Sequence, residues 1–381
     1  MKQYELIATT TFGIEAICKR ELIALGFEVT KTENGKVTFL SDKAGIAKAN
    51  LWLRTADRVL LKIGEFKAVT FDQLFDKTKA LPWHEYISVD GKFTVNGKSV
   101  KSKLFSISDC QAIVKKSIVE NLKAKHHVSW FPETGADFTV LISILKDVAT
   151  LTIDTSGPAL HKRGYRVKTV EAPLKETLAA ALVLLSFWNK DRVLHDVFCG
   201  SGTIPIEAAM IGRNIAPGLS RDFASKQWNW IGDDVWKEEK KEAFKAIDYD
   251  ADIKIFASDI SQDCVDAAIE NADEAGVDDC ITFVKSDFRQ LELKNDYGIL
   301  ICNPPYGVRL EELPQVKRFT GIMGRLFGPL DTWSKYVLTS YVEFEKEYRK
   351  DSDRKRKLYN GSIETWYYQY YGPRPPREEK K

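Results

Sequence analysis

The segment ILICNPPYG, residues 299–307, sets an amide side chain and an aromatic ring directly after an apolar run that is typical of a buried strand. Consecutive prolines cannot donate to a sheet ladder, so the strand must end before Pro304 and Pro305. The residue before each proline is pushed into an extended conformation, which stiffens the backbone. The pattern therefore predicts either a plain sharp turn or a rigid platform that presents Asn303 and Tyr306 to a ligand.

A glycine-containing turn follows another apolar run, RVLHDVF, at residues 192–198. Gly200 and Gly202 allow a tight turn and a close approach of the backbone to a ligand, and the helix expected next begins with free N–H groups. Such a helix start also attracts a carboxylate. The third glycine of the dinucleotide pattern G-x-G-x-x-G is absent, which disfavours a nicotinamide dehydrogenase. The predicted cofactor-binding residues of this turn are Asp196, Phe198, Gly200, Ser201, Gly202 and Thr203.

Acidic residues end two further strand-like runs. Asp259 ends IKIFASD and could accept both hydroxyls of a ribose, although an insertion separates it from the glycines by more than the usual spacing. Asp287 ends CITFVKSD and could accept from an adenine amino group, with Phe288 against the ring. Any one of these aspartates could be a helix N-cap, but acids at successive strand ends favour a ligand site. Asp259, Ile260, Asp287, Phe288 and Asn303 complete the predicted cofactor-binding set.

The elements that must position these residues alternate between apolar strands and amphipathic helices from about residue 170 onward. This alternation predicts a mostly parallel, doubly wound sheet, in which ligands lie beyond the carboxyl ends of the strands. Residues 1–60 read as a small β-α-β-β-α sandwich, and residues 61–155 as a second unit that closes with two alternating strands. The predicted fold class is α/β combined with α+β, with a basic linker at 156–172 and a catalytic domain at 173–381.

Basic side chains gather in two places ahead of the catalytic half. A charge run is usually only a solvated surface, but it can also contact phosphates. The net charge of +2 is nearly neutral, so an anionic partner must be met by such local patches. A third basic run, residues 354–357, is as easily a solvated edge as a surface that faces nucleic acid. The residues predicted to contact nucleic acid are Lys98, Lys101, Lys103, His161, Lys162, Arg163 and Arg166.

The remaining composition favours an ordinary globular protein of the cytoplasm, with 44% hydrophobic residues. The longest apolar run, residues 178–188, is too short to cross a bilayer, and the first residues lack the apolar core of a secretory signal. Six cysteines without a C-x-x-C pair argue for reduced thiols and against a zinc site or a disulfide framework. We therefore expect no metal and no membrane partner.

The ordered motifs DVFCGSGT, FASDI, VKSDF and NPPYG resemble those of S-adenosylmethionine-dependent amino-methyltransferases. The segments HKRGYR, APLKETLAAAL and RDFASKQW narrow the resemblance to the bacterial THUMP-domain RNA guanine-N2 methyltransferases of the RlmL type. The likeness is close in the catalytic half and rests mainly on element order and charge before it. It implies a ferredoxin-like domain at 1–60, a THUMP RNA-binding domain at 61–155 and a Rossmann-like methyltransferase domain at 173–381.

The resemblance also implies the chemistry. The Asn303 side-chain oxygen and the Pro304 carbonyl would accept the two hydrogens of an exocyclic amine, and Tyr306 would stack on the base. The methyl group of S-adenosylmethionine is already activated on a sulfonium, so positioning and electrostatics would dominate catalysis and no metal is needed. A base inside a helix could not reach such a pocket, so the nucleotide must be flipped out or unpaired.

The implied function is N2 methylation of a guanosine in large-subunit ribosomal RNA, by a monomer or weak dimer. Transfer RNA is an alternative substrate, since relatives with this architecture act on it. The NPPY motif alone also allows adenine methylation of DNA or glutamine methylation of a protein. A different class of function, a non-catalytic RNA-binding assembly factor, is disfavoured by the complete motif set.

Overall fold

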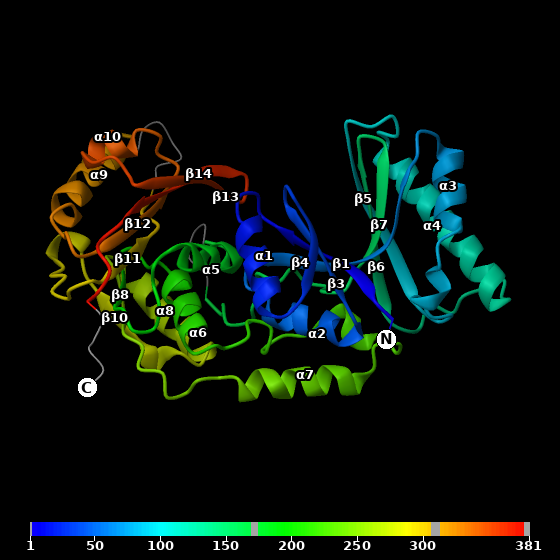
Figure 1. Ribbon diagram of the computed structural model, residues 1–381, viewed down its shortest axis with the longest axis horizontal. Coiled ribbons are helices and arrows are strands. Elements are labelled where there is room, and N and C mark those ends of the chain that lie inside the picture. Colours follow the sequence, from blue (N-terminus) through cyan, green and yellow to red (C-terminus); the bar gives the residue numbers. More distant parts are fainter. Residues whose placement is uncertain (1, 169–173, 306–312, 377–381) are drawn as a thin grey trace. The chain divides into compact units, whose positions relative to one another are not determined.

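The computed structural model describes residues 2–168, 174–305 and 313–376 (Figure 1). Its internal contacts divide the chain into two compact units. The first unit comprises residues 1–10, 18–160 and 221–242, and the second comprises residues 11–17, 161–220 and 243–381. The predicted boundaries at 60, 155 and 172 stay a prediction, and the two units divide the chain differently, since residues 221–242 lie within the predicted 173–381 domain but belong to the first unit.

In the first unit, the described residues form one mixed seven-stranded sheet in the order β2-β3-β1-β4-β7-β6-β5. The long strand β4 pairs antiparallel with β1 on one side and with β7 on the other, so both N-terminal modules share this sheet. β5 pairs with β6 in parallel. The strands are β1 (Tyr4–Thr10), β2 (Glu28–Glu33), β3 (Lys36–Ser41), β4 (Ala56–Lys67), β5 (Lys92–Val100), β6 (Asp137–Leu145) and β7 (Val148–Asp154).

The insertion at residues 221–242 packs into the first unit rather than with the catalytic residues that flank it in sequence. Trp228 and Trp236 are about 1% exposed within the hydrophobic core of this unit, and the Trp228 ring stacks on Phe138 of β6 at 5.0 Å. The helices of this part are α1 (Glu15–Ala24), α2 (Lys43–Trp52), α3 (Phe71–Lys79), α4 (Ile107–His126) and α7 (Asp233–Lys245), of which α7 continues past the insertion.

The second unit confirms the predicted doubly wound sheet. Its described strands follow the order β10-β9-β8-β11-β12-β14-β13, in which β10 through β12 are parallel and the last two pairs are antiparallel. The strands are β8 (Leu194–Asp196), β9 (Ile255–Asp259), β10 (Ile281–Lys285), β11 (Ile299–Cys302), β12 (Ser334–Thr339), β13 (Arg354–Asn360) and β14 (Ile363–Tyr370). The helices are α5 (Glu176–Leu185), α6 (Thr203–Gly212), α8 (Gln262–Glu274), α9 (Leu313–Phe327) and α10 (Phe344–Tyr348).

Burial explains why the short strands of this sheet are so apolar. All four residues of β11 are fully buried, as expected for a parallel strand covered on both faces. The aromatic run of β14 is also buried, with Tyr367, Tyr368 and Tyr370 at most 2% exposed. β11 stops at Cys302, directly before the Asn-Pro-Pro segment, as predicted. Among the described helices, none is long and apolar enough to span a membrane.

Candidate cofactor and active site

The predicted site residues meet at one edge of the second sheet. β8 lies between β9 and β11, and the three strands are parallel, so their carboxyl ends face the same way. Asp196 ends β8, Asp259 ends β9, and Asn303 directly follows β11. Because the chain runs from β8 outward to β9 and β10, and then back across β8 to β11, the boundary between β8 and β11 is the topological switch point.

The turn after β8 is held in shape by the neighbouring strand. Gly200 and Gly202 have φ values of +52° and +82°, the left-handed conformation that glycine adopts without strain. The Gly200 N–H donates to the Asp259 carboxylate at 3.0 Å. A Cβ at Gly202 would lie 3.0 Å from the Cβ of Ala268 on α8, so the backbone approaches α8 too closely for a side chain. This turn delivers the chain to the start of α6, where the first N–H groups lack intrahelical acceptors.

The hydroxyls of Ser201 and Thr203 have a different partner from the predicted cofactor. Arg166 donates to Ser201 Oγ at 2.9 Å and to Thr203 Oγ1 at 3.0 Å. Both residues are about 4% exposed. The two hydroxyl oxygens therefore already have an internal donor in the basic linker, and their contact with a cofactor stays a prediction.

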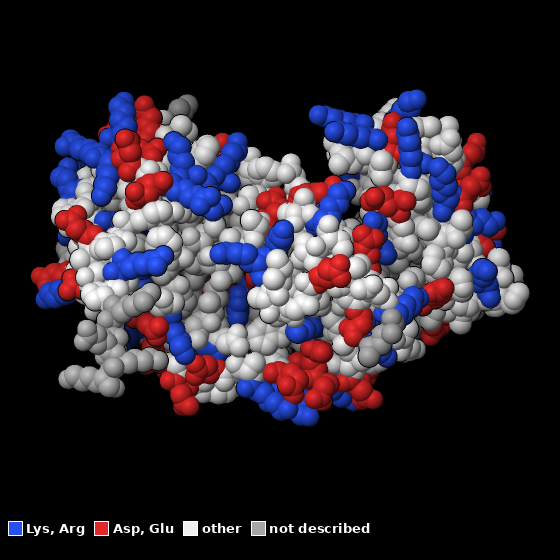
Figure 2. Space-filling view, in the orientation of Figure 1, with Lys and Arg blue, Asp and Glu red and all other residues white. Residues whose placement is uncertain are grey.

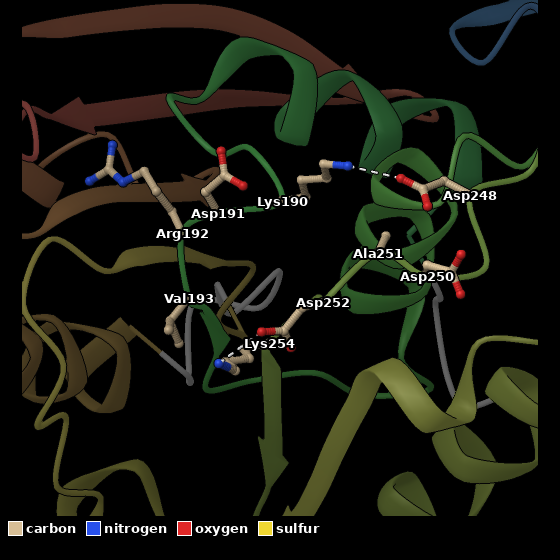
Figure 3. Close-up of a pocket in the computed structure, with 9 residues that line it drawn as sticks. All are labelled: Lys190, Asp191, Arg192, Val193, Asp248, Asp250, Ala251, Asp252 and Lys254. Atoms are coloured by element: carbon tan, nitrogen blue, oxygen red, sulfur yellow. Dashed lines mark hydrogen bonds and ion pairs between the residues drawn. The ribbon is translucent and has the colours of Figure 1, made fainter. Parts of the chain in front are cut away.

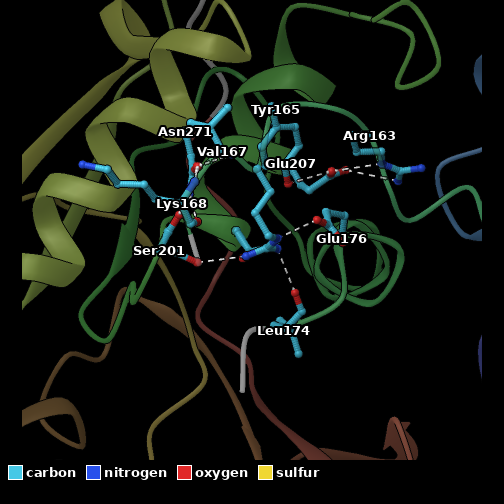
Figure 4. Close-up of polar contacts among 11 residues, drawn as sticks. Arg163, Tyr165, Val167, Lys168, Leu174, Glu176, Ser201, Glu207 and Asn271 are labelled. Atoms are coloured by element: carbon cyan, nitrogen blue, oxygen red, sulfur yellow. Dashed lines mark hydrogen bonds and ion pairs between the residues drawn. The ribbon is translucent and has the colours of Figure 1, made fainter. Parts of the chain in front are cut away.

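Arg163 and Arg166, which are predicted to bind RNA, both have carboxylate partners inside the protein. The Arg163 guanidinium is 2% exposed and pairs with the buried carboxylate of Glu207, which also accepts from the Tyr165 hydroxyl (Figure 4). Arg166 pairs with Glu176 at 2.8 Å and its side chain is 14% exposed. Buried arginines that already have carboxylate partners have little surface left for a phosphate.

The lysines predicted to bind RNA in the first unit are placed differently. Lys98 on β5, and Lys101 and Lys103 in the turn after it, are exposed. Figure 2 shows basic side chains gathered over this end of β5. Within the part of the chain that the structure describes, no ion pair neutralises these three lysines. Of the linker residues, Lys162 is exposed and His161 is half-buried.

The apolar residues predicted around the adenine differ in exposure. Phe288 is 4% exposed and packs against Phe198 and Phe319 with ring centroids 4.9 and 4.8 Å away, so little of its surface is left for a ligand. Ile260, which follows Asp259, is 65% exposed and is the better candidate for contact with a flat ring. Asp287 carries an ion pair with Arg289, whose hydrogen bond lowers the pKa of the Asp287 carboxyl.

Asn303 lies at the end of β11 with an unsatisfied acceptor. Its side-chain Oδ1 is buried, and no group among the described residues donates to it. Pro304 is buried and Pro305 is exposed, whereas Tyr306 lies outside the described residues. A buried carbonyl oxygen without a donor is costly, so it points to a hydrogen-bond donor that a ligand brings.

Asp196 has an unusual ionisation at this edge. Its side chain is 1% exposed, and burial, reinforced by the nearby charge of Asp259, raises its pKa to about 8. The Phe198 N–H, which donates to this carboxyl at 3.1 Å, opposes the shift. The Asp196 carboxyl therefore holds its proton to a much higher pH than an ordinary aspartate does.

The Asp196→Asn variant should lose part of the pH dependence of stability. The folded pKa of about 8 exceeds the usual 3.8, so the folded state binds the extra proton between these values and its stability falls as pH rises. The slope is at most about 1.4 kcal/mol per pH unit. Asparagine stays neutral and keeps the acceptor for Phe198, so the variant should gain stability over wild type from pH 5 to pH 8. Urea unfolding at several pH values measures the free energy of unfolding of both proteins. The exposed Asp252→Asn is the control. A difference between Asp196→Asn and wild type that stays constant with pH would contradict the prediction.

A separate cavity lies at the opposite end of the same strands (Figure 3). Its walls come from the segments before β8 and before β9. Two ion pairs, Lys190–Asp248 and Lys254–Asp252, lie among the residues that line it. Ligands of doubly wound sheets bind at the carboxyl ends, so this cavity is not the expected cofactor site. The lining residues are Lys190, Asp191, Arg192, Val193, Asp248, Asp250, Ala251, Asp252 and Lys254.

Sequence reasoning missed three polar residues that support the site, namely Glu176, Glu207 and Asn271. All three are at most 4% exposed. Glu207 stands in the apolar helix α6, and an acid within such a run is a signal that a buried cation must be near. No local pattern identifies that cation as Arg163, which is 44 residues away.

Known proteins are similar to this chain over nearly its whole length. Family models match in three places: an RlmL ferredoxin-like domain at residues 5–60, a THUMP domain at 68–154, and an RMKL-like methyltransferase domain at 163–369. A candidate RNA methyltransferase of Bacillus subtilis (strain 168), YpsC, is 52% identical over 382 residues, with 100% of this chain and 99% of that protein covered.

Two solved structures are similar over nearly their full length. One is from Listeria monocytogenes and is named a predicted N6-adenine-specific DNA methylase, with a TM-score of 0.93, 51% identity, and 98% and 97% of the two chains covered. The other, SMU.472, is named as a candidate methyltransferase complexed with SAH (S-adenosylhomocysteine), with a TM-score of 0.94, 44% identity, and 99% and 100% covered.

Proposed function

Because the chain belongs to the RlmL-like family of THUMP-domain methyltransferases, we propose that it methylates the exocyclic N2 amine of a guanosine in large-subunit ribosomal RNA. The methyl donor is S-adenosylmethionine, which supplies an electrophilic methyl group on a sulfonium. The observation that carries the proposal is the buried Asn303 Oδ1, for which no donor exists among the described residues. An amine hydrogen of the target base would satisfy it.

Asn303 and Pro304 together would orient the amine. The lone pair of an exocyclic base amine is delocalised into the ring, which makes the nitrogen a poor nucleophile. Hydrogen bonds from its two hydrogens to Asn303 Oδ1 and to the Pro304 carbonyl would localise that lone pair and aim it at the methyl group. Tyr306 would stack on the base, which returns about 1–3 kcal/mol of the cost of unstacking it from the RNA.

The edge formed by β8 and β9 would hold the methyl donor. Asp259 is the acid at the end of β9 and would accept from the ribose hydroxyls. The glycine turn and the first N–H groups of α6 would receive the carboxylate of the amino-acid part. Ile260 would contact the adenine, since its side chain is exposed at this edge.

The exposed lysines of the first unit support RNA as the substrate. Lys98, Lys101 and Lys103 would contact phosphates without reading sequence, which suits recognition by the shape of a folded RNA. The relatives' names disagree on this point, since one refers to RNA and another to DNA. All six cysteines are free, which fits a protein that works in the cytoplasm.

The experiment is nucleoside mass spectrometry of RNA from cells that lack this protein, with the modified position mapped. We expect loss of one N2-methylguanosine from large-subunit ribosomal RNA and its return when purified protein is added with S-adenosylmethionine. Loss from transfer RNA instead would favour the alternative substrate. Transfer to adenine in duplex DNA would contradict RNA methylation, and binding of RNA without any methyl transfer would favour an assembly factor.

A further inference from the structure

We propose that Arg166 is a positioning residue of the cofactor turn, through which the basic linker fixes the turn for S-adenosylmethionine. The inference rests on the proposed function, because it takes the turn after β8 to be the cofactor site. Arg166 would not touch the cofactor or the RNA. It would act through the hydroxyls of Ser201 and Thr203, which it holds inside the protein.

Each nitrogen of the Arg166 guanidinium donates a hydrogen bond to a neighbouring residue. Nε donates to Glu176 Oε1 at 2.8 Å, and Nη1 donates to Ser201 Oγ at 2.9 Å. Nη2 donates to Thr203 Oγ1 at 3.0 Å and to the Leu174 carbonyl at 3.1 Å. One planar side chain therefore joins the segment before α5 to the turn before α6. Lysine carries the charge but cannot hold several fixed partners in one plane.

Asn271 of α8 also joins the linker to the cofactor turn (Figure 4). Its Oδ1 accepts from the N–H groups of Val167 and Lys168 at 3.0 and 3.1 Å. Its Nδ2 donates to the carbonyls of Lys168 and Ser201, both at 3.1 Å. The amide is 1% exposed, and both its donors and its acceptor are used. Ser201 is thus fixed by its hydroxyl and by its carbonyl at once.

This arrangement has a direct consequence for ligand binding. With the hydroxyls of Ser201 and Thr203 turned to Arg166, the turn presents backbone rather than side chains to a ligand. The N–H groups of Gly200 and Gly202 already donate to Asp259 and to the Cys199 carbonyl, so the N–H groups that a ligand would meet are those at the start of α6. Two glycines in this short turn would otherwise leave it flexible, and ordering a flexible turn lowers affinity. The hydrogen bonds of Arg166 and Asn271 order the turn before the ligand binds and so remove that cost.

The experiment is a double-mutant cycle in S-adenosylhomocysteine affinity, measured by calorimetry with the full chain. Arg166→Lys should weaken binding about tenfold or more, as the loss of hydrogen bonds to a charged group does. The pair Ser201→Ala and Thr203→Val should weaken it as well, and should add little once Arg166→Lys is present. At saturating S-adenosylmethionine, the rate of methyl transfer should recover.

Lys168→Ala is the matched control, because Lys168 is in the same linker but its exposed side chain pairs with Glu270 and not with the turn. Its affinity and melting temperature should match wild type. If Arg166→Lys does not fold, the Ser201→Ala and Thr203→Val pair still tests the contact on its own.

Three results would contradict the inference or the premise on which it rests. Wild-type affinity in Arg166→Lys, with binding lost in Asp259→Ala, refutes the role of Arg166 and leaves the proposed function intact. If the losses of affinity in Arg166→Lys and in the hydroxyl variants add fully, Arg166 does not act through these hydroxyls. Its role would then be limited to stabilising α5. Wild-type affinity in Asp259→Ala too would instead contradict the cofactor role of the turn, on which the inference stands.

Discussion

Replacing Asn303 by alanine should abolish methyl transfer while the affinity for S-adenosylhomocysteine stays near that of wild type. The Asn303 Oδ1 is buried without a donor, so its proposed partner is the amine of the target base. Removal of one preorganised hydrogen-bonding group at a reacting centre lowers kcat by about two to three orders of magnitude. Single-turnover transfer of labelled methyl to undermethylated ribosomal RNA measures the rate, and calorimetry measures the affinity.

The controls separate chemistry from folding. Asn303→Asp keeps an acceptor oxygen at the same place and should retain more activity than Asn303→Ala. Asn34→Ala removes an exposed amide from the hairpin turn between β2 and β3 and should transfer methyl at the wild-type rate. A wild-type rate in Asn303→Ala would rule out the proposed orientation of the amine.

Replacing Asp259 by alanine should weaken S-adenosylhomocysteine binding by about a hundredfold or more. The carboxylate accepts from the Gly200 N–H and so shapes the glycine turn, and the proposed ribose contacts use the same group. Each hydrogen bond to a charged partner contributes about 1.5–3 kcal/mol, and two such losses give about two orders of magnitude or more in Kd. Calorimetric titration provides the measurement.

Asp252→Ala is the counterpart at the other end of the same strand. Asp252 precedes β9, its carboxylate is 80% exposed, and it pairs with Lys254 beside the cavity of Figure 3. Its removal should leave the affinity unchanged. If Asp252→Ala weakened binding and Asp259→Ala did not, the cofactor would bind at the amino ends of the strands, against the proposal.

The site could be predicted from the sequence to the extent that it depends on strand ends. Apolar runs predicted the positions of β8, β9 and β11, and the two prolines predicted the end of β11. Once a doubly wound sheet is inferred, Asp196, Asp259 and Asn303 must meet at its carboxyl edge.

The partners of the polar side chains could not be predicted in this way. Arg163 and Arg166 stand in a run that reads as a basic surface, yet both are paired with carboxylates of α6 and α5. A charge in a loop can be solvated, bound to phosphate or buried against an acid, and the sequence nearby is the same in each case. Phe288 illustrates the same limit, because only the packing of Phe198 and Phe319 decides that its ring is covered.

By itself the sequence determined the order of strands and helices, the position of the chemical groups at the strand ends, and the resemblance to a methyltransferase family. These depend on local periodicity and on motifs, which a single chain displays directly. Only the tertiary structure decided that the linker residues Arg163 and Arg166 are paired with carboxylates inside the protein, and that the insertion at 221–242 joins the first unit. Both outcomes depend on contacts between residues far apart in the chain, whose energies local patterns do not encode.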